Sequence, residues 1–149
     1  MSPLELPTEL IALITKGAWP LTEQESNRQR MFTAPISREL IQHYVPEESE
    51  IWLCPPPFRT VAERCASGEA KYWDEFGSLD QVDPTRTLLI GDFGIGTETA
   101  IALDYRRAES PPVLRLSWIG GQPKTRWVPF FATFGEFAAA LGIDGAIWR

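Results

Sequence analysis

The most informative segment of the sequence is LLIGDFGIGTETAIALDYR, which runs from Leu88 to Arg106. Within it, two apolar runs, 88–91 and 99–105, flank a loop that contains Gly94 and Gly96. Apolar runs bounded by glycine are typical of the two strands of a β-hairpin. Glycine also supplies the positive φ that a hairpin loop often requires. The stretch therefore predicts a hairpin.

The second run of this stretch alternates between two kinds of side chain. Successive side chains of a strand point to opposite faces of a sheet. One face would carry Ile101, Leu103 and Tyr105, and the other would carry Ala100, Ala102 and Asp104. The alternation predicts that the hairpin is the central strand pair of a sheet.

The loop GDFGIGTE at 91–98 has the glycine content of a phosphate-binding loop, but not its context. A P-loop needs a lysine followed by serine or threonine, and a dinucleotide fingerprint needs a helix after its glycines. Here the three glycines have a different spacing, no lysine follows them, and the next element is a strand. The loop is interpreted as a turn, and no cofactor is predicted.

The elements around the hairpin predict an α+β domain. Leucines and isoleucines at helical spacing predict a first helix that Thr8 caps, and Thr133 and Glu136 have the spacing of a capping box at the start of the last helix. Helices are predicted at 6–16, 36–44, 59–66 and 134–141, and further strands at 51–54, 113–118 and 126–129. We expect a single domain over 1–149, a central and mostly antiparallel sheet with helices packed on it.

Composition limits the class of protein. A hydrophobic content of 44% over 149 residues is enough to build a core, which argues against disorder. No apolar run approaches the roughly 18 residues of a membrane helix, and the start MSPLELPTEL has no secretory pattern. These features predict a cytoplasmic protein that does not bind or span a membrane.

Few residues have the chemistry of a catalytic site. Cys54 and Cys65 are predicted to be reduced thiols, and His43, the single histidine, is predicted to lie at the surface without a metal or nucleophile partner. Asp92, Glu98 and Asp104 form the best carboxylate set, but nothing in the sequence brings them into one cleft. We therefore predict no enzyme, no catalytic residue and no metal site.

Charge is distributed unevenly along the chain. Residues 41–104 hold twelve acidic and four basic side chains, a net charge of −8, whereas residues 105–149 have a net charge of +3. An acidic middle argues against nucleic acid as a partner, because nucleic-acid binding needs a basic surface. It suits a basic protein partner, and the alternative is that these acids only keep the surface soluble.

Two acidic segments are candidates for contact with such a partner. The segment at 69–84, EAKYWDEFGSLDQVDP, mixes aromatic and acidic side chains, and tryptophan is enriched at binding hot spots. Its aromatic residues could equally pack on the core while its acids are solvated. The candidate contact residues are Trp73, Asp74, Glu75, Asp80 and Asp83, with Glu47, Glu48 and Glu50 as charges at the rim.

Four short motifs carry a resemblance to a known family. IGDFGIG, IALDY, VLRLSW and RWVPF resemble the SUKH superfamily, which includes fungal cell-wall-assembly regulators and many bacterial immunity proteins. The resemblance extends to LPTELIALITKGAW at 6–19 and to TFGEFAAALGI at 133–143. The matching positions, for which the resemblance implies a role in the fold, are Gly91, Asp92, Phe93, Gly94, Gly96, Asp104 and Trp127.

The resemblance implies a function without catalysis. Small bacterial members of the superfamily look like immunity proteins, so we expect this chain to bind and neutralise a cognate protein toxin, such as a basic nuclease-like domain. The alternatives are a regulatory scaffold that binds several proteins, and a small-molecule binder or enzyme with a cleft beside the hairpin. Such a cleft would be marked by a strongly perturbed carboxylate, with Asp92 and Asp104 as the candidates. The oligomeric state stays open.

Overall fold

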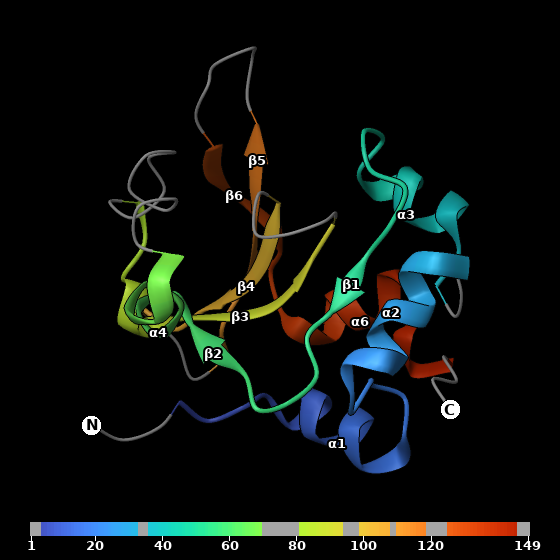
Figure 1. Ribbon diagram of the computed structural model, residues 1–149, viewed down its shortest axis with the longest axis horizontal. Coiled ribbons are helices and arrows are strands. Elements are labelled where there is room, and N and C mark those ends of the chain that lie inside the picture. The colour runs from blue at the N-terminus through green and yellow to red at the C-terminus, as the bar shows by residue number, and fades with distance from the viewer. Residues whose placement is uncertain are drawn as a thin grey trace.

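The computed structural model describes residues 4–32, 36–69, 81–93, 99–107, 110–118 and 125–145. Its centre is an antiparallel sheet with the strand order β1-β3-β4-β5-β6, and β2 also pairs with β3 (Figure 1). The strands are β1 (Trp52–Leu53), β2 (Arg59–Thr60), β3 (Thr87–Asp92), β4 (Ala100–Asp104), β5 (Val113–Trp118) and β6 (Thr125–Phe131). The α+β prediction, with helices on an antiparallel sheet, is confirmed.

Helices flank this sheet on both sides. Figure 1 shows α4 on one side of the sheet and α1, α2, α3 and α6 on the other. The α-helices are α1 (Thr8–Lys16), α2 (Glu23–Phe32), α3 (Arg38–Tyr44), α4 (Val61–Arg64) and α6 (Phe134–Ala140). The shorter turns are η1 (Cys65–Glu69), η3 (Pro84–Arg86) and η4 (Ile143–Gly145).

The predicted hairpin is β3 and β4, and it is central. The two strands pair antiparallel, with Leu88 opposite Leu103 and Asp92 opposite Ala100. The alternation along β4 divides the core as predicted. Ile101, Leu103 and Tyr105 join the larger hydrophobic cluster, whereas Ala100 and Ala102 join a second cluster on the other face. Every residue of both strands is buried because each face of the hairpin is covered.

The first helix ends as the sequence predicts, but it begins differently. Pro7 occupies the N-cap position without a side-chain cap, and Thr8 is the first helical residue, bonded through its hydroxyl to Glu9. The helix stops at Gly17, whose φ of 82° is in the left-handed region that glycine adopts at little cost. Trp19 then anchors the chain in the core, with no exposed surface.

Residues 59–66 differ from the predicted helix. Arg59 and Thr60 are extended and pair with β3, and the helix starts only at Val61. The cause is a capping box: the Thr60 hydroxyl accepts from the Glu63 N–H at 3.1 Å, and the Glu63 carboxylate accepts from the Thr60 N–H at 3.0 Å. A Ser/Thr cap of this kind holds its own backbone in the β region.

The closing helix α6 lies where the sequence predicts a helix, and one face of it is buried. Phe134, Phe137, Ala138 and Leu141 are all buried in the larger cluster. The Thr133 hydroxyl accepts from the Glu136 N–H at 3.1 Å, as a cap should, while the Glu136 carboxylate reaches the Ala132 N–H at 3.2 Å. The reciprocal half of the predicted box is therefore shifted by one residue.

Side chains close both edges of the sheet. On β6, the Trp127 N–H donates to the Gln81 side chain at 2.7 Å, and Pro129 has no N–H to offer. Beside β1, the Leu53 carbonyl accepts from the buried Ser26 hydroxyl at 2.6 Å, and the Cys54 carbonyl accepts from the Trp19 indole at 2.8 Å. Strand addition at these positions would need these bonds to break.

Candidate functional site

The predicted rim acids lie together between α3 and β1. Glu47 is 58% exposed, and its carboxylate faces the Arg115 guanidinium of β5 at 3.6 Å. Glu48 and Glu50 are partly buried. The pKa of the Glu48 carboxyl group is raised by the negative charges of Glu47, Glu50 and Asp92, the last of which is at the end of β3. We call Glu47, Glu48, Glu50 and Asp92 the acidic patch.

The charge of the acidic patch is poorly balanced. Partial burial, together with the negative charges of Glu47 and Asp92, raises the pKa of Glu48 to about 7, although the positive charge of Arg115 acts to lower it. A carboxyl group with this pKa is only about half ionised at neutral pH. A cation placed beside Glu48 would therefore favour its ionised form.

Asp92 closes the base of the glycine loop. Its carboxylate, in a residue only 6% exposed, accepts from the Thr99 hydroxyl at 3.2 Å, and the neighbouring Phe93 N–H donates to the Thr99 carbonyl at 3.3 Å. Phe93 is buried and packs edge-on against Phe130, with ring centroids 5.7 Å apart. Gly94 and Gly96 lie outside the described residues. Asp92 and Phe93 thus join the hairpin to the core.

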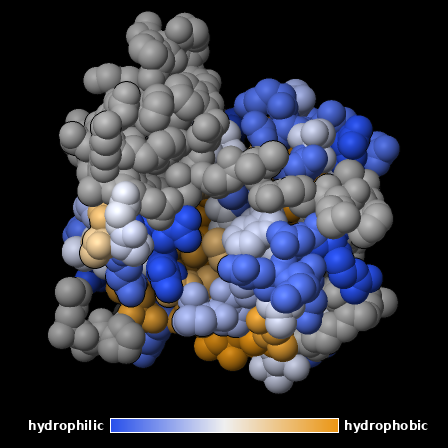
Figure 2. Space-filling view, viewed as in Figure 1, coloured by the Kyte–Doolittle hydropathy of each residue, from blue (hydrophilic) through white to orange (hydrophobic). Residues whose placement is uncertain are grey.

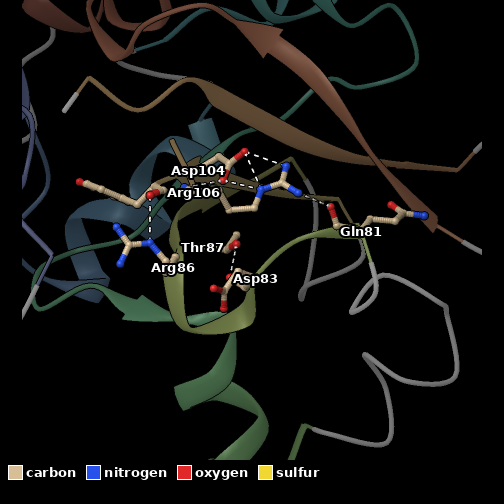
Figure 3. Close-up of polar contacts among 7 residues, drawn as sticks. Gln81, Asp83, Arg86, Thr87, Asp104 and Arg106 are labelled. Carbon is tan, nitrogen blue, oxygen red and sulfur yellow. Dashed lines mark hydrogen bonds and ion pairs between the residues drawn. The ribbon is translucent and has the colours of Figure 1, made fainter. Parts of the chain in front are cut away.

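Asp104 lies at the end of the hairpin opposite Asp92 and has a different structural role. It pairs in register with Thr87, and its carboxylate receives both Nε and Nη2 of Arg106, the latter at 2.8 Å (Figure 3). Arg106 also donates to the Gln81 carbonyl at 3.0 Å. Burial acts to raise the pKa of Asp104, but the hydrogen bonds from Arg106 outweigh it and hold that pKa below its usual value.

Because Asp92 and Asp104 stand at opposite ends of β3 and β4, the structure does not bring them together as an acid–base pair. Glu98, the third carboxylate of that set, lies outside the described residues. Among the described residues, the carboxyl group with a strongly raised pKa is that of Glu48, which the sequence predicts only as a charge at the rim. A prediction of Glu48 would have required knowing that β1 lies beside β3, because Asp92 belongs to β3.

The predicted contact residues do not form one surface in the part that the structure describes. Asp83 caps η3 by accepting from the Thr85 N–H and hydroxyl, and these hydrogen bonds lower its pKa. It lies beside Thr87, at the Asp104 end of the hairpin (Figure 3), whereas Asp92 of the acidic patch is at the opposite end of β3. The other contact candidates, Trp73, Asp74, Glu75 and Asp80, lie outside the described residues.

Gly91 and Trp127, two further positions of the family resemblance, have structural roles. A Cβ atom at Gly91 would lie 2.9 Å from the Trp52 carbonyl oxygen, so only glycine lets β1 approach β3 this closely. Trp127 is 8% exposed and belongs to the second hydrophobic cluster with Leu114 and Leu116. Both residues therefore shape the sheet.

The predicted thiols and histidine are where the sequence places them. Cys54 and Cys65 are partly buried and are not joined in a disulfide, and His43 is exposed at the end of α3 with its ring against Tyr44. Burial raises the pKa of Cys54 to about 12, so its thiol stays protonated at neutral pH. Among the described residues, no three His, Cys, Asp or Glu side chains are placed to hold a metal ion.

Two cavities, which the sequence did not predict, lie on either side of the turn at 55–58. The smaller, of about 420 Å³, is lined by Cys54, Arg59 and Arg64 among others. The larger, of about 580 Å³, is a mostly apolar groove between the N-terminal segment, α4 and η3. Both cavities form where segments that are distant in the sequence meet, so no local sequence pattern predicts them.

Comparison of the chain with protein-family models, with curated proteins and with solved structures finds no match. Within the described ranges, none of the helices has the length and apolar character needed to cross a membrane.

Proposed function

We propose that this protein is a SUKH-like, non-catalytic binding domain that neutralises a basic protein toxin in the cytoplasm, as bacterial immunity proteins do. The proposed mechanism is occlusion: the domain covers the toxin's working surface in a one-to-one complex. Such a role needs no cofactor and no turnover. The motifs of the central hairpin and its neighbours support the family, and the charge of the acidic patch supports a basic partner.

The observation that supports the proposal most directly is the raised pKa of Glu48. Its pKa of about 7 reflects burial and the negative charges of Glu47, Asp92 and Glu50, which outweigh the opposing effect of the Arg115 guanidinium. A lysine or arginine of a partner would supply the missing positive charge. Because this would favour the ionised form of Glu48, binding should release a proton near neutral pH.

Proton release gives the proposed complex a pH signature. If the partner binds the ionised form of Glu48, affinity rises with pH as long as free Glu48 still carries a proton. We expect affinity for the basic partner to increase from pH 6 to pH 8. Screening by salt should weaken the complex and slow its association.

The test begins with affinity capture of the tagged protein from its native cells and mass spectrometry of the bound proteins. We expect one stoichiometric partner with a toxin-like domain, whose toxicity co-expression suppresses. Several substoichiometric partners would favour a regulatory scaffold instead.

Charge reversal then locates the interface. The double variant Glu47→Lys/Glu48→Lys should weaken the captured complex at least 100-fold, because it turns the centre of the acidic patch positive. The matched control is Glu5→Lys/Glu23→Lys, which makes the same charge change at two exposed positions outside the patch. Unchanged affinity for the first variant would place the interface elsewhere on the protein.

A further inference from the structure

The larger cavity is a groove with an apolar lining and few polar groups. Its volume of about 580 Å³ is in the range of small-molecule sites, about 300–1,000 Å³. The apolar part of its lining includes Leu4, Leu6, Phe58, Ala62 and Leu88. Figure 2 shows apolar residues reaching the surface along the lower edge of this face, where the N-terminal segment and α1 run. The groove shares no lining residue with the acidic patch.

One wall of this groove is held in place by a hydrogen bond and by apolar packing. Leu4 and Leu6 belong to the extended segment before α1, and the carbonyl of Glu5 between them accepts from the Tyr105 hydroxyl at 2.6 Å. Both leucines also pack against the larger hydrophobic cluster. A wall held in this way is available before any ligand arrives, which lowers the entropic cost of binding.

Arg86 is the cationic group of the groove. Its Nε donates to the Tyr105 carbonyl at 3.0 Å, which holds the guanidinium in place (Figure 3). Within the part of the chain that the structure describes, its Nη1 and Nη2 atoms make no hydrogen bond. Glu63 also lines the groove, but its Oε1 is occupied by the Thr60 N–H and hydroxyl as the cap of α4. The hydroxyls of Thr60 and Thr85, the other side-chain donors in the described lining, already donate to Glu63 and Asp83, so the unused side-chain donors are those of Arg86.

We propose that this groove binds a small amphipathic carboxylate, with the apolar chain against the leucines and Phe58 and the carboxylate at Arg86. A guanidinium fork pairs with a carboxylate through two parallel hydrogen bonds, and Arg86 has its two terminal nitrogens available for them. A neutral alcohol of the same chain length would keep the apolar contacts but lose this pair. The ammonium group of a primary amine would be repelled by the positive charge of Arg86.

The experiment compares three probes of equal chain length: octanoate, octanol and octylammonium. Titration calorimetry should give octanoate a dissociation constant at least tenfold lower than those of the other two. Methyl NMR should show octanoate shifting Leu4, Leu6 and Leu88. Equal or tighter binding of octanol or octylammonium, or the absence of binding by octanoate, would overturn the proposal.

Variants separate recognition of charge from a change in shape. Arg86→Met should weaken octanoate about tenfold and leave octanol unchanged, because it removes the pair and keeps an apolar stem. Arg107→Met removes the same charge from an exposed position that does not line the groove, and should leave both probes unaffected. Ala62→Phe, which fills the groove from α4, should weaken octanoate and octanol together. An Arg86→Met protein that still prefers octanoate would contradict the assignment of the carboxylate to Arg86.

Discussion

Arg86 and Tyr105 exchange two hydrogen bonds at the end of the central hairpin. The Tyr105 N–H donates to the Arg86 carbonyl at 2.9 Å, and the Arg86 side chain returns a bond to the Tyr105 carbonyl at 3.0 Å. The Tyr105 hydroxyl then reaches the carbonyl of Glu5, 100 residues earlier in the chain. The pair thus connects the central strands with the N-terminal wall of the apolar groove.

Removing the Tyr105 hydroxyl should detach this wall. Tyr105→Phe leaves the Glu5 carbonyl without its donor, and we expect the free energy of unfolding to fall by about 1–1.5 kcal/mol in urea denaturation. Hydrogen exchange in residues 4–7 should speed up more than in β4. Tyr44→Phe is the control, since Tyr44 is exposed and its hydroxyl makes no hydrogen bond within the described residues. Equal losses for the two variants would show that the bond to Glu5 contributes nothing.

The ion pair of Asp104 and Arg106 should make stability depend on acid pH. The pKa of Asp104 is lowered in the folded protein, so its contribution is complete above the usual aspartate value of about 4. It is lost as the pH falls through the folded value. Asp104→Asn should therefore cost about 1 kcal/mol at pH 7, since Arg106 is 43% exposed, and progressively less below pH 4.

Its control is the surface pair of Lys16 and Asp144, in which the aspartate is 72% exposed. Asp144→Asn should change the free energy of unfolding by less than about 0.5 kcal/mol at either pH. Urea denaturation at pH 7 and pH 3 measures both variants. A cost for Asp104→Asn that is the same at both pH values would contradict the ionic origin of the effect.

Gly91 should tolerate no side chain. Gly91→Ala would place its Cβ atom 2.9 Å from the backbone oxygen of Trp52, so β1 must move away from β3. We expect a loss of about 2 kcal/mol or more in the free energy of unfolding, because backbone atoms cannot relieve the overlap by changing rotamer. Gly145→Ala, where nothing lies within 4 Å of the new atom, should cost less than about 0.5 kcal/mol. Thermal unfolding of both variants measures the difference.

Glu48 should destabilise the folded protein above neutral pH. Its pKa is raised from 4.5 to about 7, so the folded state binds more protons than the unfolded state between these values. Stability attributable to Glu48 therefore falls as the pH rises through this window. Glu48→Gln should flatten the profile and be about 1 kcal/mol more stable than the natural protein at pH 8, a value that allows for solvent screening of a partly exposed group.

The control for Glu48 is Glu50→Gln, which removes a neighbouring charge but keeps the group that titrates. Glu50 is the smallest of the contributions to the raised pKa of Glu48, so the slope between pH 5 and pH 7 should largely persist. Denaturation profiles across this range distinguish the two variants. A slope that Glu50→Gln abolishes and Glu48→Gln preserves would assign the titration to another group.

The sheet and the helix stripes could be predicted from local pattern because their causes are local. A period of two placed Ile101 and Leu103 on one face of β4, and a period of 3.6 placed Phe134 and Phe137 on one face of α6. Gly17 and Thr133 marked helix ends through their own backbone and side-chain chemistry. The predicted cap at Thr8 is wrong, because Pro7 occupies the N-cap position there. The cap at Thr60 was not predicted, although Thr60 and Glu63 have the same T-x-x-E spacing as Thr133 and Glu136.

Local sequence pattern was therefore enough to predict the class of fold, the central hairpin and the acidic middle of the chain. Which acidic side chains lie close together, and which pair with a basic side chain, depends instead on the tertiary structure. Asp92 joins Glu48 because β1 pairs with β3, and Asp104 lies at the far end of the same strands because antiparallel register separates the two. The groove at Arg86 likewise exists because segments 100 residues apart meet through Tyr105. Such relations depend on long-range packing, and no periodicity along the chain encodes them.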